Sequence, residues 1–150
     1  MAKLYTNSVQ DAQDVLQDAY IICFEKMATF VGDEPKAFYG WMKRITINLA
    51  ISKNRKLYKR NERSTDMSTL DPPFDADVLS EMSRREIMAI IMDLAPSYRR
   101  IFGLYVLEGY SHKEITSMLD ISASTSRSQF IRAKRILQKK IGQLQNLDVI

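Results

Sequence analysis

The chain has 150 residues, of which 45% are hydrophobic and 27% are charged, and its net charge of +4 weakly favours an acidic partner. A single cysteine and a single histidine exclude a disulfide framework and a Cys/His zinc site, and no cofactor is expected. The longest apolar stretches, such as YIICF, are far shorter than the roughly 20 residues that cross a bilayer, and MAKLYTNSV lacks the apolar core of a signal peptide, so a cytoplasmic protein without membrane insertion is expected.

Helical periodicity predicts two helices in the first half of the chain. Ser8 with Asp11 forms a variant of the capping box and predicts the start of the first helix. Gly32 and Pro35 interrupt the pattern before the second helix, which continues into a basic tail. The apolar positions are Ala12, Val15, Leu16, Ala19, Cys23, Met27 and Phe30 in the first helix, and Phe38, Trp41, Met42, Ile45 and Leu49 in the second.

The charged residues are distributed unevenly along the chain. Residues 43–63 and 123–140 are strongly basic, whereas residues 64–83 contain acids and no lysine or arginine. The acidic stretch STDMSTLDPPFDADVLS is typical of a linker, which predicts one domain over 1–62, a linker over 63–82 and a second domain over 83–143. One basic run is most simply a solvated helix face, but two runs, each at the end of a helical domain, favour a nucleic-acid partner.

The second half of the chain opens with further helix signals. Ser83 and Glu86 form a capping box ahead of an apolar pattern that reaches Leu94. Pro96 suits the first turn of the next helix, and Gly109 suits a left-handed C-cap at its end. No strand pair and no internal repeat is evident, so the predicted fold class is all-α, with two small helical domains.

The stretch GYSHKEITSMLDISASTSRSQFIRAKRIL, residues 109–137, predicts two helices joined by a very short turn. Ser111 with Glu114 is a capping box for the first of these helices. Asp120 takes a turn position where a left-handed backbone conformation is expected, and Ser122 caps the next helix. A join this tight fixes the angle between the two helices.

The last of these helices has two different faces. Ser126, Phe130, Ala133 and Leu137 share the inward face at 100° per residue. Polar and basic side chains that point outward near the start of such a helix are typical of the recognition helix of a helix-turn-helix, although an ordinary helical hairpin with a charged face is the alternative. The outward residues are Ser124, Ser128, Ile131, Arg132 and Arg135, flanked by Arg127 and Gln129.

The residues from LAPSYRRIFGLYVLEGYSHKEI to TSRSQFIRAKRILQKKI resemble region 4 of bacterial sigma factors of the extracytoplasmic-function (ECF) type, in a form most similar to variants from Bacteroidetes. DAQDVLQDAYIICFEKM and FYGWMKRITINLAISKNRK resemble the helices of region 2, so the resemblance covers nearly the whole chain in the order of the family. Three features depart from the common pattern. The first helix of region 2 is shortened to MAKLYTNS, Asp120 stands where glycine is common, and Ser126 stands where an aliphatic residue is common.

The resemblance implies a sigma factor, the subunit that gives RNA polymerase its promoter specificity during transcription initiation. Region 4 would read the −35 element of promoter DNA. Region 2 would dock on the clamp helices of the β′ subunit and capture a base of the melted −10 element. The implied partners are the polymerase core, with its β and β′ subunits, and promoter DNA; an anti-sigma factor is a further candidate partner.

Candidate site residues follow from these implied roles. Asn48 lies midway along a helix, where asparagine is mildly disfavoured, and is therefore a candidate for a polar contact to DNA. The acidic face of the first helix suits protein docking. The candidates are Asp14, Gln17 and Asp18 for polymerase docking; Phe30, Tyr39, Lys43, Arg44, Asn48, Lys53 and Arg55 for −10 DNA; the outward face of residues 124–135 for −35 DNA; and His112, Lys113 and Lys139 for the DNA backbone.

Three other classes of function stay open at this point. A stand-alone helix-turn-helix regulator would explain the recognition helix but not the acidic docking face. An enzyme would need a metal site, and Asp11, Asp14 and Asp18 share a helix face, but no second acidic cluster with helical spacing completes one. A purely structural interaction module would leave both basic helices unexplained. We therefore expect neither an enzyme nor a metal site.

Overall fold

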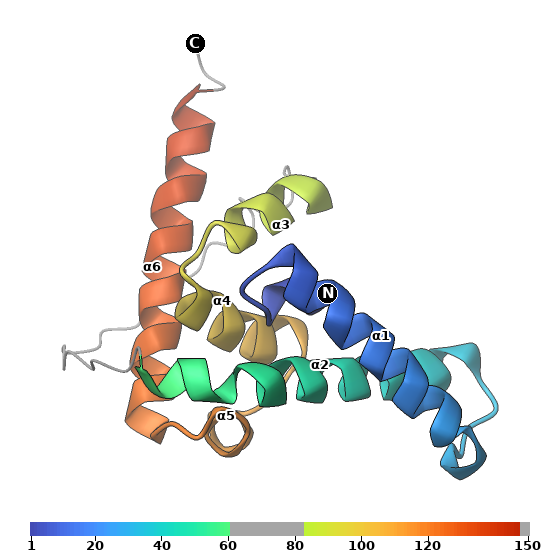
Figure 1. The fold of residues 1–150 in the computed structure, drawn as a ribbon. Helices are drawn as coiled ribbons and strands as arrows, with labels where there is room; N and C mark the ends of the chain where they lie inside the picture. Colours follow the sequence, from blue (N-terminus) through green and yellow to red (C-terminus); the bar gives the residue numbers. More distant parts are fainter. Residues whose placement is uncertain (61–82, 148–150) are drawn as a thin grey trace. The chain divides into compact units, whose positions relative to one another are not determined.

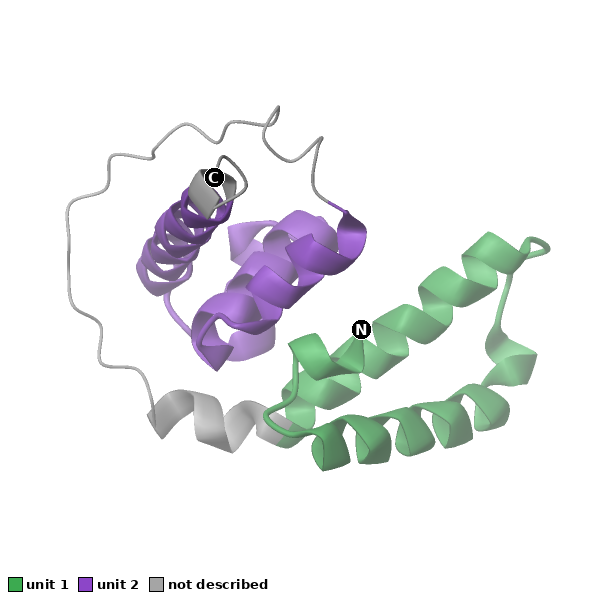
Figure 2. Ribbon diagram, turned by 90° about the horizontal axis from the view of Figure 1, so that it is seen from above, with its two compact units in different colours: residues 1–60 green, residues 61–150 purple. Residues whose placement is uncertain are grey.

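The computed structural model describes the backbone of residues 1–60 and 83–147, and the side chains of residues 1–53 and 83–144. The chain forms two compact units, residues 1–60 and 61–150, which Figure 2 colours separately. Every regular element in the described ranges is a helix, as Figure 1 shows, so the predicted all-α fold class is confirmed. The predicted linker, residues 63–82, lies outside the described residues.

Unit 1 is a helical hairpin in which α2 returns alongside α1. Its core is contributed by the N-terminal segment and the two long helices, since Tyr5, Val15, Ile47 and Ala50 are at most 1% exposed. The N-terminal turn therefore packs as part of this core rather than as a loose end. The elements of unit 1 are η1 (Ala2–Leu4), α1 (Val9–Glu25), η2 (Met27–Thr29) and α2 (Pro35–Arg60).

Helix α1 starts where its capping signal predicts and ends earlier than its apolar pattern predicts. The Ser8 side chain accepts a hydrogen bond of 3.0 Å from the backbone N–H of Asp11, which satisfies one of the unpaired donors at the helix start. The helix ends at Glu25, and Met27 lies in η2, 44% exposed. Leu16, predicted to face inward, is 39% exposed, because the face packed against α2 is narrow and made of small residues such as Ala19.

Unit 2 is built around its last helix, against which the other helices of the unit pack. The centre of the unit is apolar, since Ile101, Leu104, Ile115 and Ala133 are at most 1% exposed. These residues come from different helices, so the packing fixes the helices against one another. The elements of unit 2 are α3 (Arg84–Met92), α4 (Pro96–Phe102), η4 (Gly103–Leu107), α5 (His112–Leu119) and α6 (Ala123–Leu147).

Local sequence signals set the helix boundaries in the first part of unit 2. Ser83 and Glu86 form the predicted capping box, in which the backbone N–H of Ser83 donates to the Glu86 carboxylate over 2.8 Å. These hydrogen bonds lower the pKa of Glu86, because they favour its charged form. Pro96 occupies the first turn of α4, and Gly109 has a φ of +77°, the left-handed conformation expected at that position. The helix between them differs from the prediction, since it changes to a π-helix at Gly103.

Candidate nucleic-acid interface

The helix-turn-helix begins with a reciprocal cap on α5. The backbone N–H of Ser111 donates to the Glu114 carboxylate over 2.8 Å, and the Ser111 side chain accepts from the backbone N–H of Glu114 over 3.3 Å. Two donors that a helix start would otherwise leave unpaired are thus satisfied within four residues. The start of α5 is therefore encoded locally, as the sequence predicts.

The turn between α5 and α6 is held in a single conformation by two residues. Asp120 has φ 57° and ψ 48°, the left-handed conformation, and its backbone N–H donates to the carbonyl of Thr116. This conformation reverses the chain at once, so α5 ends at Leu119 and α6 begins at Ala123. The Ser122 side chain then accepts from the backbone N–H of Thr125 over 3.0 Å and caps α6. Both predicted features of the turn, the left-handed Asp120 and the Ser122 cap, are thus present.

Helix α6 directs its apolar side chains at the rest of unit 2 and its polar side chains away from it. Ser126, Ala133 and Leu137 are at most 3% exposed, and Phe130 contacts the Phe102 ring with the ring centroids 6.2 Å apart. Of the predicted −35 residues, Ser124, Arg127 and Arg135 are exposed, whereas Ser128, Gln129, Ile131 and Arg132 are half-buried. Lys113 on α5 and Lys139 on α6 are also exposed.

One basic residue of α6 is directed inward. Lys134 is only 9% exposed, and its ammonium lies 6.0 Å from the centre of the Phe130 ring. A cation over an aromatic face at this distance is attracted by the ring, and the apolar stem of lysine packs well in such a place. The basic run of α6 is therefore not uniformly available to DNA.

His112, a candidate for the DNA backbone, makes contacts within unit 2. Its Nδ1 lies 2.8 Å from the Oγ of the buried Ser126, and its ring stacks on Tyr105 with the centroids 4.5 Å apart. Burial lowers the pKa of His112, and the charge of Arg127 lowers it further. A half-buried ring that favours its neutral form is better suited to internal packing than to phosphate binding.

A pocket of about 320 Å³ lies in unit 1 beside the loop between α1 and α2. At this pocket the ring of Phe30 packs against two other aromatic rings. Its centroid lies 5.4 Å from that of Phe38 and 5.2 Å from that of Trp41. Of the predicted −10 residues, Phe30 and Arg44 line this pocket, whereas Tyr39 does not and is 59% exposed. The lining residues are Thr29, Phe30, Val31, Ala37, Gly40, Trp41 and Arg44.

The remaining −10 candidates lie along α2. Asn48 and Lys53 are exposed, and Lys43 is half-buried. The side chain of Arg55 lies outside the described residues.

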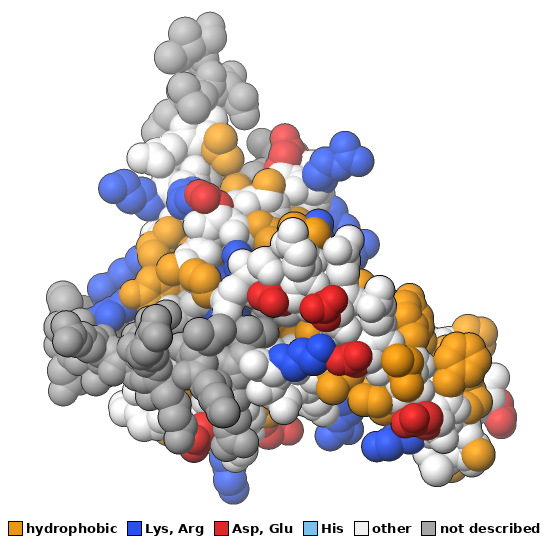
Figure 3. Space-filling model, in the orientation of Figure 1, with side chains coloured by type: hydrophobic (Ala, Val, Ile, Leu, Met, Phe, Trp, Pro, Cys, Tyr) orange, Lys and Arg blue, Asp and Glu red, His pale blue; other side chains and the backbone are white. Residues whose placement is uncertain are grey.

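The acidic face of α1 is exposed, but one of its residues pairs within the unit. Asp14 and Gln17 are exposed, and Asp18 lies 2.5 Å from the ammonium of Lys53 on α2. The hydrogen bond to Asp18 is the main reason that the pKa of Lys53 is raised. Figure 3 shows acidic and hydrophobic side chains next to one another over α1. Since both members of the pair are more than 40% exposed, each can exchange its partner for another charge.

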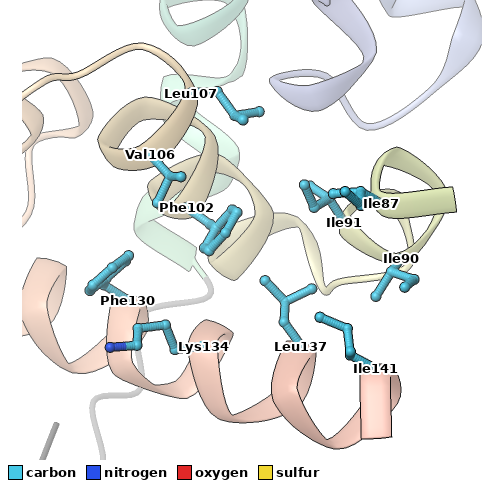
Figure 4. Close-up of a pocket in the computed structure, with 10 residues that line it drawn as sticks. All are labelled: Ile87, Ile90, Ile91, Phe102, Val106, Leu107, Phe130, Lys134, Leu137 and Ile141. Carbon is cyan, nitrogen blue, oxygen red and sulfur yellow. The ribbon is translucent and has the colours of Figure 1, made fainter. Parts of the chain in front are cut away.

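Each unit has an exposed apolar surface that the sequence did not predict. In unit 2 a groove of about 380 Å³ opens between α3, α4, η4 and α6, and Figure 4 shows its side chains directed into it. Its lining is apolar apart from Lys134, and it includes the isoleucines of the apolar pattern predicted for α3. In unit 1, Tyr20, Ile21 and Phe24 on α1 are 53%, 57% and 76% exposed. Periodicity marks such residues as apolar but does not reveal which are left uncovered.

Two other kinds of site are absent from the described residues. No group of three or more His, Cys, Asp or Glu side chains in these ranges is arranged to hold a metal ion. No helix in the same ranges is both long and apolar enough to span a bilayer.

Comparison with known proteins gives matches over both units. The family models for sigma-70 region 2 and sigma-70 region 4 match residues 1–60 and 84–137. The ECF RNA polymerase sigma-E factor of Escherichia coli is 30% identical over 148 residues, which cover 89% of this chain and 75% of that protein. The RNA polymerase sigma-H factor of Pseudomonas aeruginosa is 31% identical over 154 residues, which cover 93% of this chain and 78% of that protein.

A solved structure supports the fold independently. The sigma factor RpoE from Bartonella quintana, crystallised in complex with the anti-sigma factor NepR, matches with a TM-score of 0.52. The match covers 92% of this chain and 85% of that chain, at 20% sequence identity. The two family models together span most of the chain, and the curated relatives reach 31% identity over most of their own length. The chain therefore belongs to the sigma-70 family and is an ECF-type sigma factor.

Proposed function

We propose that the chain gives RNA polymerase its promoter specificity, with unit 2 reading the −35 element and unit 1 both docking on the polymerase clamp and capturing a base of the melted −10 element. The observation that carries the proposal is the capped helix, tight turn and basic helix formed by α5 and α6. The chain acts in the cytoplasm, as a subunit of the polymerase, and carries no catalytic chemistry of its own. By analogy with the Bartonella quintana structure, an anti-sigma factor is a further partner.

Helix α6 is suited to the major groove of DNA. Its first turns present Ser124, Arg127 and Ser128, and its sequence from Ala123 to Lys140 contains no acid. Arginine and glutamine hydrogen bond to base edges in the major groove, whereas lysine commonly meets phosphate. Reading is therefore assigned to the N-terminal half of α6, and charge neutralisation to exposed lysines such as Lys113 and Lys139.

Residues of α6 are expected to differ in what their substitution does. Arg132→Ala or Gln129→Ala should change which −35 sequences are preferred, by about 1–3 kcal/mol for each hydrogen-bonded base pair that is no longer recognised. Lys139→Ala should instead weaken binding to all sequences alike and lower the salt dependence by about one counterion. The measurement is the affinity of the polymerase holoenzyme for a set of base-substituted promoters at several salt concentrations. If all three variants weaken binding to every promoter alike, α6 is not the element that reads the −35 sequence.

The pocket in unit 1 is suited to a flipped base. Its volume of about 320 Å³ lies at the lower end of the range of small-ligand pockets. Phe30 and Trp41 provide aromatic surface, and Arg44 provides a positive charge beside it. Flipping a base costs a few kcal/mol, and stacking it on an aromatic ring returns about 1–3 kcal/mol. The pocket can therefore help to hold a melted strand without hydrolysis of a nucleotide.

Removal of the Phe30 ring should weaken strand capture selectively. Phe30→Leu is expected to reduce the affinity of the holoenzyme for single-stranded −10 DNA by about 1–3 kcal/mol, the contribution of one stacked base. Phe24→Leu is the matched control, because it removes an exposed ring of the same unit that lies outside the pocket lining. Fluorescence of a base analogue in the strand reports capture, and a thermal melt reports folding. Equal reductions for the two variants, with folding intact, would exclude the pocket as the capture site.

A further inference from the structure

A polar pair lies inside the otherwise apolar interface between α5 and α6. Ser126 is fully buried, and its Oγ lies 2.8 Å from the Nδ1 of His112. Both helices also contribute apolar residues to the core, with Ile115 of α5 and Ala133 of α6 fully buried. A buried hydroxyl without its partner would be costly to keep in the fold, so this hydrogen bond is a strong constraint on how the two helices sit together.

The imidazole of His112 is itself held from two sides. It stacks on Tyr105 of η4, with centroids 4.5 Å apart and planes 20° apart. It meets Phe130 of α6 edge-on, with centroids 5.7 Å apart and planes 66° apart. Both are favourable geometries for aromatic rings. A ring fixed by two neighbours presents its Nδ1 to Ser126 from one direction, so the hydrogen bond is satisfied over a narrow range of α6 orientations.

Ser126 lies among the residues assigned to reading DNA. It is flanked along α6 by Ser124 and Arg127, which are exposed, and by Ser128, which is half-buried. A rotation of α6 about its own axis that broke the bond to His112 would move each of these side chains relative to the groove. An apolar residue at position 126 would pack in the same place but would supply no directional bond to His112, because attraction between apolar surfaces has no direction.

We propose that His112 and Ser126 are a positioning pair, which fixes the rotation of α6 against α5 and so determines which side chains of α6 face the bases. Because Ser126 is buried and His112 is half-buried, we assign the pair no direct contact with DNA, and it acts through Ser124, Arg127 and their neighbours. This inference rests on the proposed role of α6 as the reader, and the experiment below separates the failure of one from the failure of the other.

The chain contains one histidine, which makes the pair directly observable by NMR. Because burial and Arg127 lower the pKa of His112, its titration should fall below the ordinary value of 6.5. Ser126→Ala should change the chemical shift of the Nδ1 nitrogen in the folded chain. Ser117→Ala, which removes an exposed hydroxyl of α5, should leave that shift unchanged. If Ser126→Ala leaves the Nδ1 chemical shift of His112 unchanged, the hydrogen bond between the two residues does not form in solution.

The functional test compares promoter preference with stability in four variants of the full chain. His112→Phe and Ser126→Ala each break the pair, while His112→Asn keeps a hydrogen-bonding atom close to the position of Nδ1. In His112→Phe with Ser126→Val both partners become apolar, which is expected to restore the melting temperature, since no buried polar group is left unpaired. The measurement is the relative use of base-substituted −35 elements by the holoenzyme, beside a thermal melt of each free variant.

A positioning role predicts a distinct pattern. The variants with a broken pair, including the double variant with its restored melt, should change the ratio between −35 sequences by about fivefold or more, the lower end of what one hydrogen-bonded base contributes. His112→Asn should keep the wild-type ratio. A wild-type ratio in the stably folded double variant would overturn the proposal and leave the pair a packing feature. If Gln129→Ala and Arg132→Ala also keep the wild-type ratio, then α6 does not read the −35 element, and it is the proposed function that fails.

Discussion

Replacing Asp14 and Asp18 by lysine is expected to abolish assembly with RNA polymerase while unit 1 stays folded. Asp14 is exposed and the side chain of Asp18 is 45% exposed, whereas Val15 and Ala19 on the neighbouring face of α1 are buried. Like charges set against a basic partner surface cost several kcal/mol, which is enough to prevent docking. Within the unit the change breaks the pair of Asp18 with Lys53, and an exposed pair contributes at most about 1 kcal/mol.

The measurement for this change is capture of core polymerase by the tagged chain, beside a thermal melt of the free variant. Glu25→Lys is the matched control, because it reverses an exposed acid at the end of the same helix. An unchanged melt with polymerase capture abolished only in the double reversal supports docking through this face. If the double reversal captures as much polymerase as the wild type, this face of α1 is not the docking surface. If the wild-type chain itself captures no polymerase, the result favours a stand-alone regulator.

Leu104→Ala is expected to have the largest effect on stability among single changes in unit 2. Leu104 is completely buried, and removing a buried leucine side chain costs about 2–5 kcal/mol, because apolar burial is reduced and a cavity remains. Since small domains are stable by only about 5–15 kcal/mol, a change of this size removes a large part of the total. Unit 2 should therefore unfold at much lower temperature or denaturant concentration.

Leu107→Ala gives the matched control for the cavity. Leu107 lies in the same π-helix as Leu104 and is 40% exposed, so the two substitutions change the helix itself in the same way. Denaturant unfolding of the full chain, followed by circular dichroism, measures both variants. A destabilisation at position 107 as large as that at 104 would mean that the loss of a leucine side chain from this helix in general, and not the cavity left at position 104, explains the effect.

Helix starts and the turn of the helix-turn-helix could be predicted from the sequence, because each depends on residues close together in the chain. Ser8, Ser83, Ser111 and Ser122 all accept a backbone hydrogen bond at the start of their helices. Asp120 adopts the left-handed conformation that its place in the turn requires. Such signals act within three or four residues, and a single sequence contains all the information they need.

Interactions between helices could not be predicted in the same way. The pairing of Asp18 with Lys53 depends on how α1 lies on α2, and the stacking of His112 on Tyr105 depends on how α5 meets η4. The exposure of Leu16 likewise depends on the width of the surface that α2 covers. Periodicity identifies an apolar face, but the partner that covers each part of that face is decided by tertiary packing.

The position of Trp41 has a practical consequence for the study of strand opening. It is the only tryptophan of the chain, and it lines the pocket beside Phe30. Its ring is half-buried, so the polarity around it changes when another molecule enters the pocket. The tryptophan fluorescence of the unlabelled protein therefore originates next to the proposed capture site. Entry of a base can be followed in real time as a change in emission, without any dye attached to protein or DNA.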